Sequence, residues 1–199
     1  MLALSRPRRT TGRGARAARP RGARPLTDGA YPEREETERL ILRPFQQSDF
    51  EVYAAMMADP EVTRYLGSGT TAGRDEAWRH LAMLAGHWRL KGFGHWAVEV
   101  KETGRFIGRV GLWYPEGWPE YEVGWVIDRT AWGHGYAAEA ARVALHHAHQ
   151  TLRLQHVISL ILPENRRSIR VAEKLGGHPE KREDFRGYDT LFYAYSRGA

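Results

Sequence analysis

The 199-residue chain contains no cysteine. This absence excludes disulfides, thiolate metal sites and a cysteine nucleophile together. Nowhere does an apolar run approach about 18 residues, the length that crosses a bilayer, and no apolar segment follows Met1 that could act as a secretory signal. We therefore expect a protein of a reducing compartment, the cytoplasm, with no membrane partner.

Acidic residues are missing from the N-terminal stretch. Residues 1–25 hold eight arginines and no acid, and the first acidic residue is Asp28. Without these arginines, 22 basic residues face 24 acidic ones, so the net charge of +6 and the pI of 9.8 come from the tail. A segment of Arg, Gly, Pro and Ala has little to bury. We expect residues 1–30 to be a disordered tail and residues 31–199 to form one domain.

Three interpretations of the arginine-rich tail stay open. It is a functionless extension, including the case of a start codon placed too early. Alternatively, residues 1–25 make a weak contact with nucleic acid or the ribosome. The third interpretation is an organelle transit peptide, which is also rich in arginine and poor in acids. The mildly acidic balance of the remaining chain favours substrates that carry positive charge.

The first part of the body is predicted to be a strand followed by two helices. Residues 37–45 alternate between polar and apolar and predict the strand. A helix capped by Ser48 and ended by Pro60 follows, and a second helix is predicted to end at Gly92. The second helix is expected to bury Trp78, Leu81, Ala85 and Trp88.

The apolar period then changes from 3.6 to 2. Strands are predicted at 94–100, 105–114 and 121–128, and a helix with an alanine-rich apolar stripe starts at Ala137. A β-branched run at 156–163 predicts a buried strand, and a helix capped by Asn165 and a closing hairpin follow it. The order of elements predicts a single α/β domain.

A glycine turn, Gly133-His134-Gly135, separates a predicted strand from the start of a helix. Such a turn exposes backbone N–H groups at the positive end of the helix dipole, where a phosphate can approach. The alternative is a tight turn that needs glycine only for a positive φ. No Gly-Lys-Ser/Thr follows, which excludes the Walker pattern, and residues 140–163 lack the acid of a dinucleotide site.

The stretch "WGHGYAAEA" resembles the acyl-CoA loop of the GNAT acetyltransferase superfamily. Four further blocks are similar to the RimJ/RimL-like branch, which contains ribosomal-protein N-terminal acetyltransferases. They are "DPEVTRYL" (59–66), "FIGRVGL" (106–112), "EVGWVID" (122–128) and "PENRRSIRVAEKLGG" (163–177). The resemblance covers about residues 36–196. It implies a mixed, mostly antiparallel sheet flanked by helices, in which two splayed strands hold acyl-CoA.

The resemblance also implies which residues hold acetyl-CoA. Two residues at the end of a strand offer backbone groups to the pantetheine, and the amides after the glycine turn hold the pyrophosphate. Trp132 replaces the Gln or Arg that often opens the loop. The assigned residues are Val126, Ile127, Trp132, Gly133, His134, Gly135, Tyr136, Ala137 and Asn165.

The implied reaction is direct attack of a primary amine, on a protein N-terminus or a small molecule, on the thioester. Glu122 is the candidate base that takes the amine proton; the alternative is a solvent-facing strand residue beside Glu120. Many family members place a Tyr acid where this chain has Ala172. Ser168 is therefore the candidate proton donor to the sulfur, unless it only helps to cap its helix.

No metal is expected, because the histidines clustered at 146–149 have neither a cysteine nor a nearby acid on their helix. The alternative to an enzyme is a non-catalytic CoA-binding module of GNAT-like fold that docks on RNA or the ribosome through its basic arm.

Overall fold

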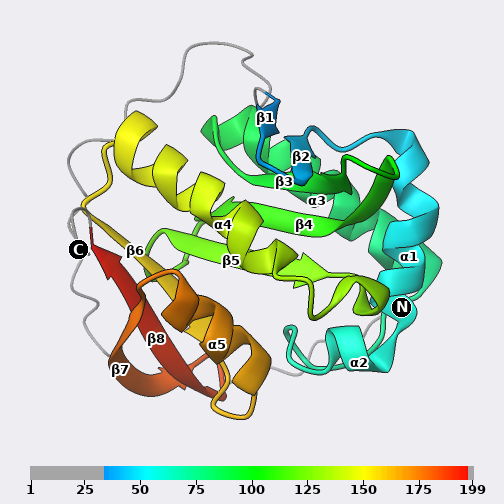
Figure 1. Ribbon diagram of the computed structural model, residues 1–199. Helices are drawn as coiled ribbons and strands as arrows, with labels where there is room; N and C mark the ends of the chain where they lie inside the picture. Colours follow the sequence, from blue (N-terminus) through cyan, green and yellow to red (C-terminus); the bar gives the residue numbers. More distant parts are fainter. Residues whose placement is uncertain (1–33, 197–199) are drawn as a thin grey trace.

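The computed structural model describes residues 34–196, which form an eight-stranded sheet with helices on both faces (Figure 1). The predicted disordered tail, residues 1–30, lies outside the described residues. The strands are β1 (Glu35–Glu36), β2 (Leu40–Arg43), β3 (His95–Val100), β4 (Arg105–Trp113), β5 (Glu122–Ile127), β6 (His156–Ile161), β7 (His178–Phe185) and β8 (Tyr188–Ser196). The helices are α1 (Phe50–Ala58), α2 (Pro60–Thr63), α3 (Arg74–Lys91), α4 (Tyr136–His146) and α5 (Arg166–Lys174).

The strands follow the order β1-β2-β3-β4-β5-β6-β8-β7, and every neighbouring pair is antiparallel except β5 and β6. The parallel pairing of β5 with β6 consists of one residue pair, Glu122 with Ile158. Beyond it, the hydroxyl of Ser159 donates to the carbonyl of Val123 at 2.6 Å, where a ladder amide would otherwise bond. The sheet therefore splits between β5 and β6. These findings confirm the predicted mixed, mostly antiparallel sheet.

Two apolar cores hold the layers together. Figure 1 shows α4 and α5 on one face of the sheet and α1 and α3 on the other. Alanines on α4 that are fully buried let this helix approach the strands closely: Ala140, Ala141 and Ala144. The core on the opposite face includes Tyr53, Met56, Leu84, Ala97 and Val126. At its C-terminal end α4 continues into a π-helical turn, His147–Thr151.

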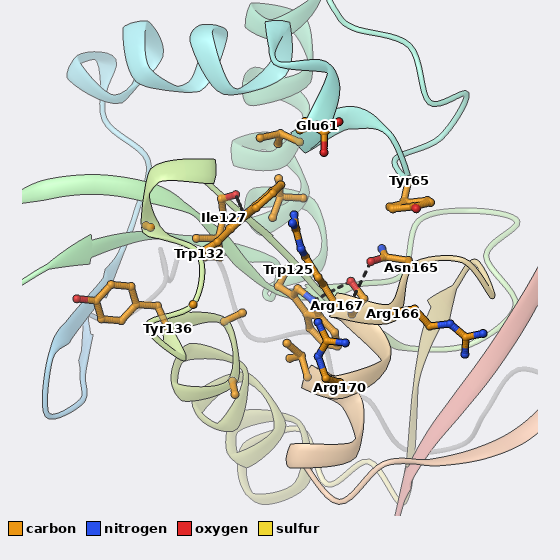
Figure 2. A pocket seen from close by; sticks show the side chains of 18 of the residues that line it. Glu61, Tyr65, Trp125, Ile127, Trp132, Tyr136, Asn165, Arg166, Arg167 and Arg170 are labelled. Atoms are coloured by element: carbon orange, nitrogen blue, oxygen red, sulfur yellow. Dashed lines mark hydrogen bonds between the residues drawn. The ribbon is translucent and has the colours of Figure 1, made fainter.

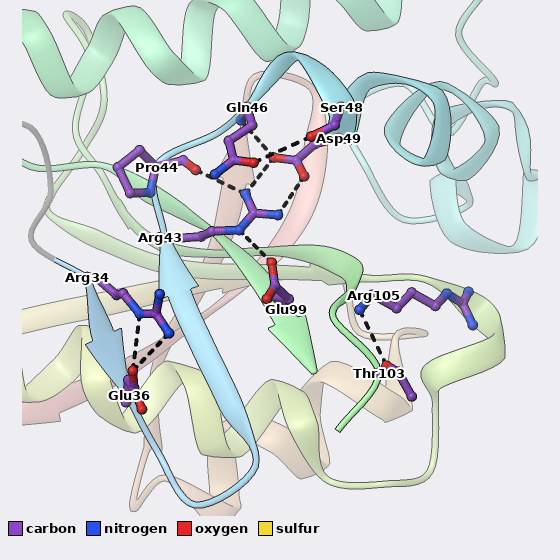
Figure 3. Close-up of polar contacts among 10 residues, drawn as sticks. All are labelled: Arg34, Glu36, Arg43, Pro44, Gln46, Ser48, Asp49, Glu99, Thr103 and Arg105. Carbon is purple, nitrogen blue, oxygen red and sulfur yellow. Dashed lines mark hydrogen bonds and ion pairs between the residues drawn. The ribbon is translucent and has the colours of Figure 1, made fainter. Parts of the chain in front are cut away.

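A buried ionic cluster fixes the start of α1 against β2 and β3 (Figure 3). The guanidinium of Arg43 donates to both carboxylate oxygens of Asp49, at 2.8 and 2.7 Å, and its Nε donates to Glu99 at 2.7 Å. Hydrogen bonds to Asp49 raise the pKa of Arg43. Asp49 also accepts from the backbone of Gln46 at 2.8 Å, so each buried charge is paired.

The predicted boundaries of α1 need correction. Ser48 does not cap it: the helix begins at Phe50, and Asp49, the residue before it, is turned inward to Arg43. Pro60 follows the end of α1 but opens α2, where a missing N–H costs nothing. The side chain of Asp59 caps α2 by accepting from the backbone of Glu61 at 2.9 Å.

The predicted stripe of α3 is also partly wrong. Trp78 is 53% exposed, whereas the buried residues are Ala77, Leu81, Leu84, His87 and Trp88. Positions 77, 81, 84 and 88 follow the helical repeat, so the stripe starts one residue before the tryptophan. The predicted end is confirmed, because Gly92 has a φ of +75° and terminates the helix. No helix among residues 34–196 is long and apolar enough to cross a membrane.

Candidate active site

A cleft of about 730 Å³ opens where β5 and β6 separate (Figure 2). Its walls are the end of β5, the N-terminus of α4, the first turns of α5 and the segment after α2. Glu61 of α2 and Tyr65 of the segment after it face the cleft, opposite Trp132 and Asn165. Two helix N-termini therefore meet in one cavity, which is a favourable place for a ligand that carries negative charge.

The glycine turn has the geometry that exposes backbone donors. Gly133 and Gly135 have φ values of +86° and +82°, a region that side chains with a Cβ rarely adopt. Helix α4 starts at Tyr136, and its first bond runs from the N–H of Glu139 to the carbonyl of Gly135 at 3.1 Å. Tyr136 and Ala137 both line the cleft, and helix geometry leaves their N–H groups without an intrahelical acceptor.

His134, at the centre of the turn, points away from the cleft. Its ring is exposed, lies 3.0 Å through Nδ1 from the carbonyl oxygen of Trp132, and stacks on Tyr136 with ring centroids 5.4 Å apart. The side chain of His134 does not line the cavity. Any contact with a ligand in the cleft therefore falls to its backbone N–H.

Trp132 is part of the cleft wall. Its indole N–H donates to the carbonyl of Ile127 at 2.8 Å, and the guanidinium of Arg167 lies 4.1 Å from the centre of its ring. The carbonyl of Ile127, which was expected to face pantetheine, is therefore already bonded. The N–H of Ile127 still points toward the gap between the strands.

The backbone N–H and carbonyl of Val126 point toward β4 and away from the gap. The N–H of Asp128 bonds to Ile107 on β4, and the alternation of a strand gives Val126 the same direction. On the opposite edge of β5, the carbonyl of Tyr121 accepts from β6, so Trp125 and Ile127 share that edge. This corrects the expectation for Val126: its side chain lines the cleft, whereas the backbone groups that face the gap belong to Trp125 and Ile127.

Asn165 is both a helix cap and a cleft residue. Its side-chain oxygen accepts from the backbone of Ser168 at 3.2 Å, which confirms the predicted N-cap of α5. The hydroxyl of Ser168 also lines the cleft and accepts from the indole N–H of Trp125 at 3.3 Å.

The sequence analysis missed the positive charge of this cleft. Five cations line it, against the two acids Glu61 and Glu164; the cations are Arg64, Arg166, Arg167, Arg170 and Lys174. A signal was present in "NRRSIRVAEK", because positions 166, 170 and 174 are spaced by one helical turn and form one face of α5.

Glu122 lies on the face of the sheet that α1 and α3 cover. It stands at the last point where β5 and β6 still pair. Its carboxylate accepts from the indole of Trp118 at 2.8 Å. Burial raises its pKa to about 7, while hydrogen bonds from Trp118 and the backbone of Leu160 and the charge of Arg109 act in the opposite direction. Glu122 is partly exposed, and its carboxylate is held by the hydrogen bond from Trp118.

Comparison with known proteins places this architecture in a family. The model of the acetyltransferase (GNAT) domain matches residues 39–178. The protein YkkB of Bacillus subtilis (strain 168) is 33% identical over 151 residues, which cover 73% of this chain and 85% of YkkB. The crystal structure of an acetyltransferase from Agrobacterium tumefaciens str. C58 superposes with a TM-score of 0.76 at 33% identity, covering 87% of this chain and 99% of that one.

A more distant structure shares the fold. RimJ of Mycobacterium smegmatis, solved in complex with CoA-disulfide, has a TM-score of 0.64 at 17% identity and covers 79% of this chain and 81% of its own. The fold, with its split between β5 and β6, defines an acetyltransferase of the GNAT type. The chain belongs to the acetyltransferase (GNAT) domain family.

Proposed function

We propose that the protein transfers an acetyl group from acetyl-CoA to a primary amine by direct attack of the amine on the thioester. The observation that carries this proposal is the cleft, where the glycine turn of α4, the N-terminus of α5 and the unpaired edge of β5 converge. The RimJ/RimL-like branch stays a prediction that depends on the sequence blocks.

The charge of the cleft supports acetyl-CoA as the ligand. Coenzyme A carries a pyrophosphate and a 3′-phosphate, and five cations against two acids line the cavity. We assign the pyrophosphate to the N–H groups from His134 to Ala137, because glycine leaves the backbone accessible there. The pantetheine lies along the gap, where Trp125 and Ile127 offer backbone groups, and Asn165 and Arg167 flank it.

Glu122 is the proposed general base. An ammonium must lose a proton before it attacks, and a base works best when its pKa is near the working pH. With a pKa of about 7, Glu122 is about half ionised at neutral pH and can accept this proton. Its place beside the split lets an acceptor on the α1–α3 face reach a thioester that enters from the cleft.

Ser168 is the proposed donor to the leaving sulfur. As the nitrogen–carbon bond forms and the carbon–sulfur bond breaks, the thiolate must take up a proton. The oxygen of Ser168 accepts from Trp125, which leaves its own hydrogen free to point into the cleft. The side chain of Ala172 is a methyl group without a proton to donate, so a donor cannot come from that position.

A thiol-release assay with acetyl-CoA across a panel of primary amines tests the proposal. We expect release that depends on the amine and an acetylated product of the matching mass. Acetyl-CoA binding without turnover of any amine would contradict the proposed reaction.

Truncation tests the alternative of a docking module. A chain that lacks residues 1–30 should keep its turnover, because the proposed catalytic residues and the residues that line the cleft lie between 61 and 174. If the full chain shows only nucleic-acid retention, and truncation removes it, the basic arm is the functional part.

A further inference from the structure

A row of polar groups crosses the α1–α3 face of the sheet beside Glu122. Arg109 of β4 places its NH1 3.1 Å from Nδ1 of His95 on β3. Next to them the hydroxyl of Tyr53 on α1 lies 2.6 Å from Nδ1 of His80 on α3. Four elements contribute to this row, and the acetyl-CoA cleft does not include any of these side chains.

The charge of Arg109 lowers the pKa of Glu122, but the two groups form no direct ion pair. No carboxylate among residues 34–196 comes within ion-pair distance of Arg109, and its buried Nε has no hydrogen-bond partner in this part of the chain. Its polar neighbours are neutral: burial lowers the pKa of His95 well below its usual value and that of His80 to about 4. A largely buried cation that is left unpaired costs stability, so it calls for an anion from outside the chain.

Gly124 lies on β5 between the strand positions of Glu122 and of Arg109's partner Val126, and the ring of His95 packs over it. Arg109 pairs with Val126, four residues along β5 from Glu122, which is about 13 Å of strand. Its guanidinium shortens this gap, because it reaches His95, which lies level with Gly124. The guanidinium and the carboxylate thus face the same short stretch of β5.

Gly124 has no structural need for glycine. Its φ is outside the left-handed region, and a Cβ atom there would make ordinary contacts, 3.4 Å from Cε1 of His95 and 3.9 Å from Oε1 of Glu122. Glycine inside a strand occurs at bulges, at bends and where a ligand or another chain segment comes close, and Gly124 leaves room beside the ring of His95. Gly124, Glu122, Arg109 and Trp113 are each partly exposed, so solvent reaches this part of the face.

We propose that the acceptor is an amine that also carries a carboxylate, which Arg109 binds while the amine faces Glu122 across Gly124. This inference rests on the proposed acetyl transfer. A guanidinium at one end of the space and a carboxylate at the other match the two charges of an amino acid. The acidic balance of the chain after the tail predicted a preference for cationic acceptors. The charge of Arg109 instead favours an acceptor that also carries a negative group.

The test compares acceptors in pairs that differ only in the carboxylate. Thiol release is measured with β-alanine against propylamine and with γ-aminobutyrate against butylamine, and α-amino acids extend the series to shorter spans. We expect kcat/KM for the best amino acid to exceed that of its partner amine by about 10- to 100-fold, the range of a charge-assisted hydrogen bond.

Two variants connect this selectivity to Arg109. Rates are compared at pH 9, where Glu122 is ionised with or without the charge of Arg109. There Arg109→Met should remove the preference and leave the Kd of acetyl-CoA unchanged, and Arg109→Lys should keep part of the preference. Arg105→Met is the matched control, because Arg105 is an exposed cation on the same strand that bonds Thr130. If circular dichroism shows that Arg109→Met does not fold, Arg109→Lys is the test. The inference then requires a smaller preference for amino acids over alkylamines in Arg109→Lys than in the wild type.

The outcomes separate the two proposals. Equal turnover of amino acids and alkylamines, or a preference that survives in the Arg109 variants, overturns the carboxylate inference and leaves acetyl transfer standing. If acetyl-CoA binds and no amine of either kind reacts, the proposed function fails and this inference fails with it.

Discussion

Replacing Glu122 by glutamine tests the proposed base through both rate and stability. The glutamine keeps an oxygen for Trp118 and Leu160 but cannot take a proton. We expect kcat with the acceptor to fall about 10²- to 10⁴-fold, the usual contribution of a general base. The Kd of acetyl-CoA should not change, because Glu122 does not line the cleft.

The pH dependence of kcat/KM and of the free energy of unfolding sets the size of the expected effects. In the wild type, kcat/KM should rise with pH through the pKa of about 7, and Glu122→Gln should lack this limb. Stability changes with pH in the opposite direction. Glu122 binds a proton more tightly in the folded chain than in the unfolded chain, so the free energy of unfolding falls as pH rises from 4.5 to about 7. The pKa difference corresponds to at most about 3 kcal/mol, so Glu122→Gln should be more stable than the wild type at pH 8 and equal at pH 4.

Steady-state rates and urea denaturation at several pH values measure these effects. Glu116→Gln is the control, because Glu116 is exposed in the loop before β5. An unchanged rate at neutral pH, or a pH profile that keeps its limb in Glu122→Gln, would remove Glu122 from the mechanism.

Three further variants test the cleft. Gly135→Ala should raise the Kd of acetyl-CoA about 10-fold or more in calorimetry, because an alanine at a φ of +82° costs about 1–2 kcal/mol and shifts the amides. Asn165→Ala should lower the free energy of unfolding in urea by about 1 kcal/mol through the lost cap, and should also weaken acetyl-CoA. Arg170→Gln should weaken acetyl-CoA more at low salt than at high salt, whereas Arg182→Gln, which breaks a surface pair with Asp189, should not. Equal effects of the two arginine variants would contradict the assignment of charge to the cleft.

The sequence predicted those features that depend on local pattern. The glycine turn before α4, the alanine stripe of that helix and the cap at Asn165 each depend on residues within a few turns of one another. The buried strand β6 was recognisable because β-branched and other apolar residues dominate it, with Ser159 the one polar residue after His156.

The errors concern direction and long-range contacts. Trp78 was placed in the core because positions 78, 81, 85 and 88 fit one helical stripe, but its side chain on α3 faces outward. Val126 was assigned a backbone role that its strand alternation gives to Trp125 and Ile127. The group around Arg109 was not predicted, because its members come from separate elements and no short motif connects them.

The central claim is that the N–H groups from His134 to Ala137 and the cations around them bind the pyrophosphate of acetyl-CoA. Isothermal titration of the folded protein with acetyl-CoA tests it most directly. We predict saturable binding of one ligand per chain, and markedly weaker binding of S-acetylpantetheine, which lacks all of the phosphates. No heat from acetyl-CoA, or equal affinity for the two ligands, would contradict the account.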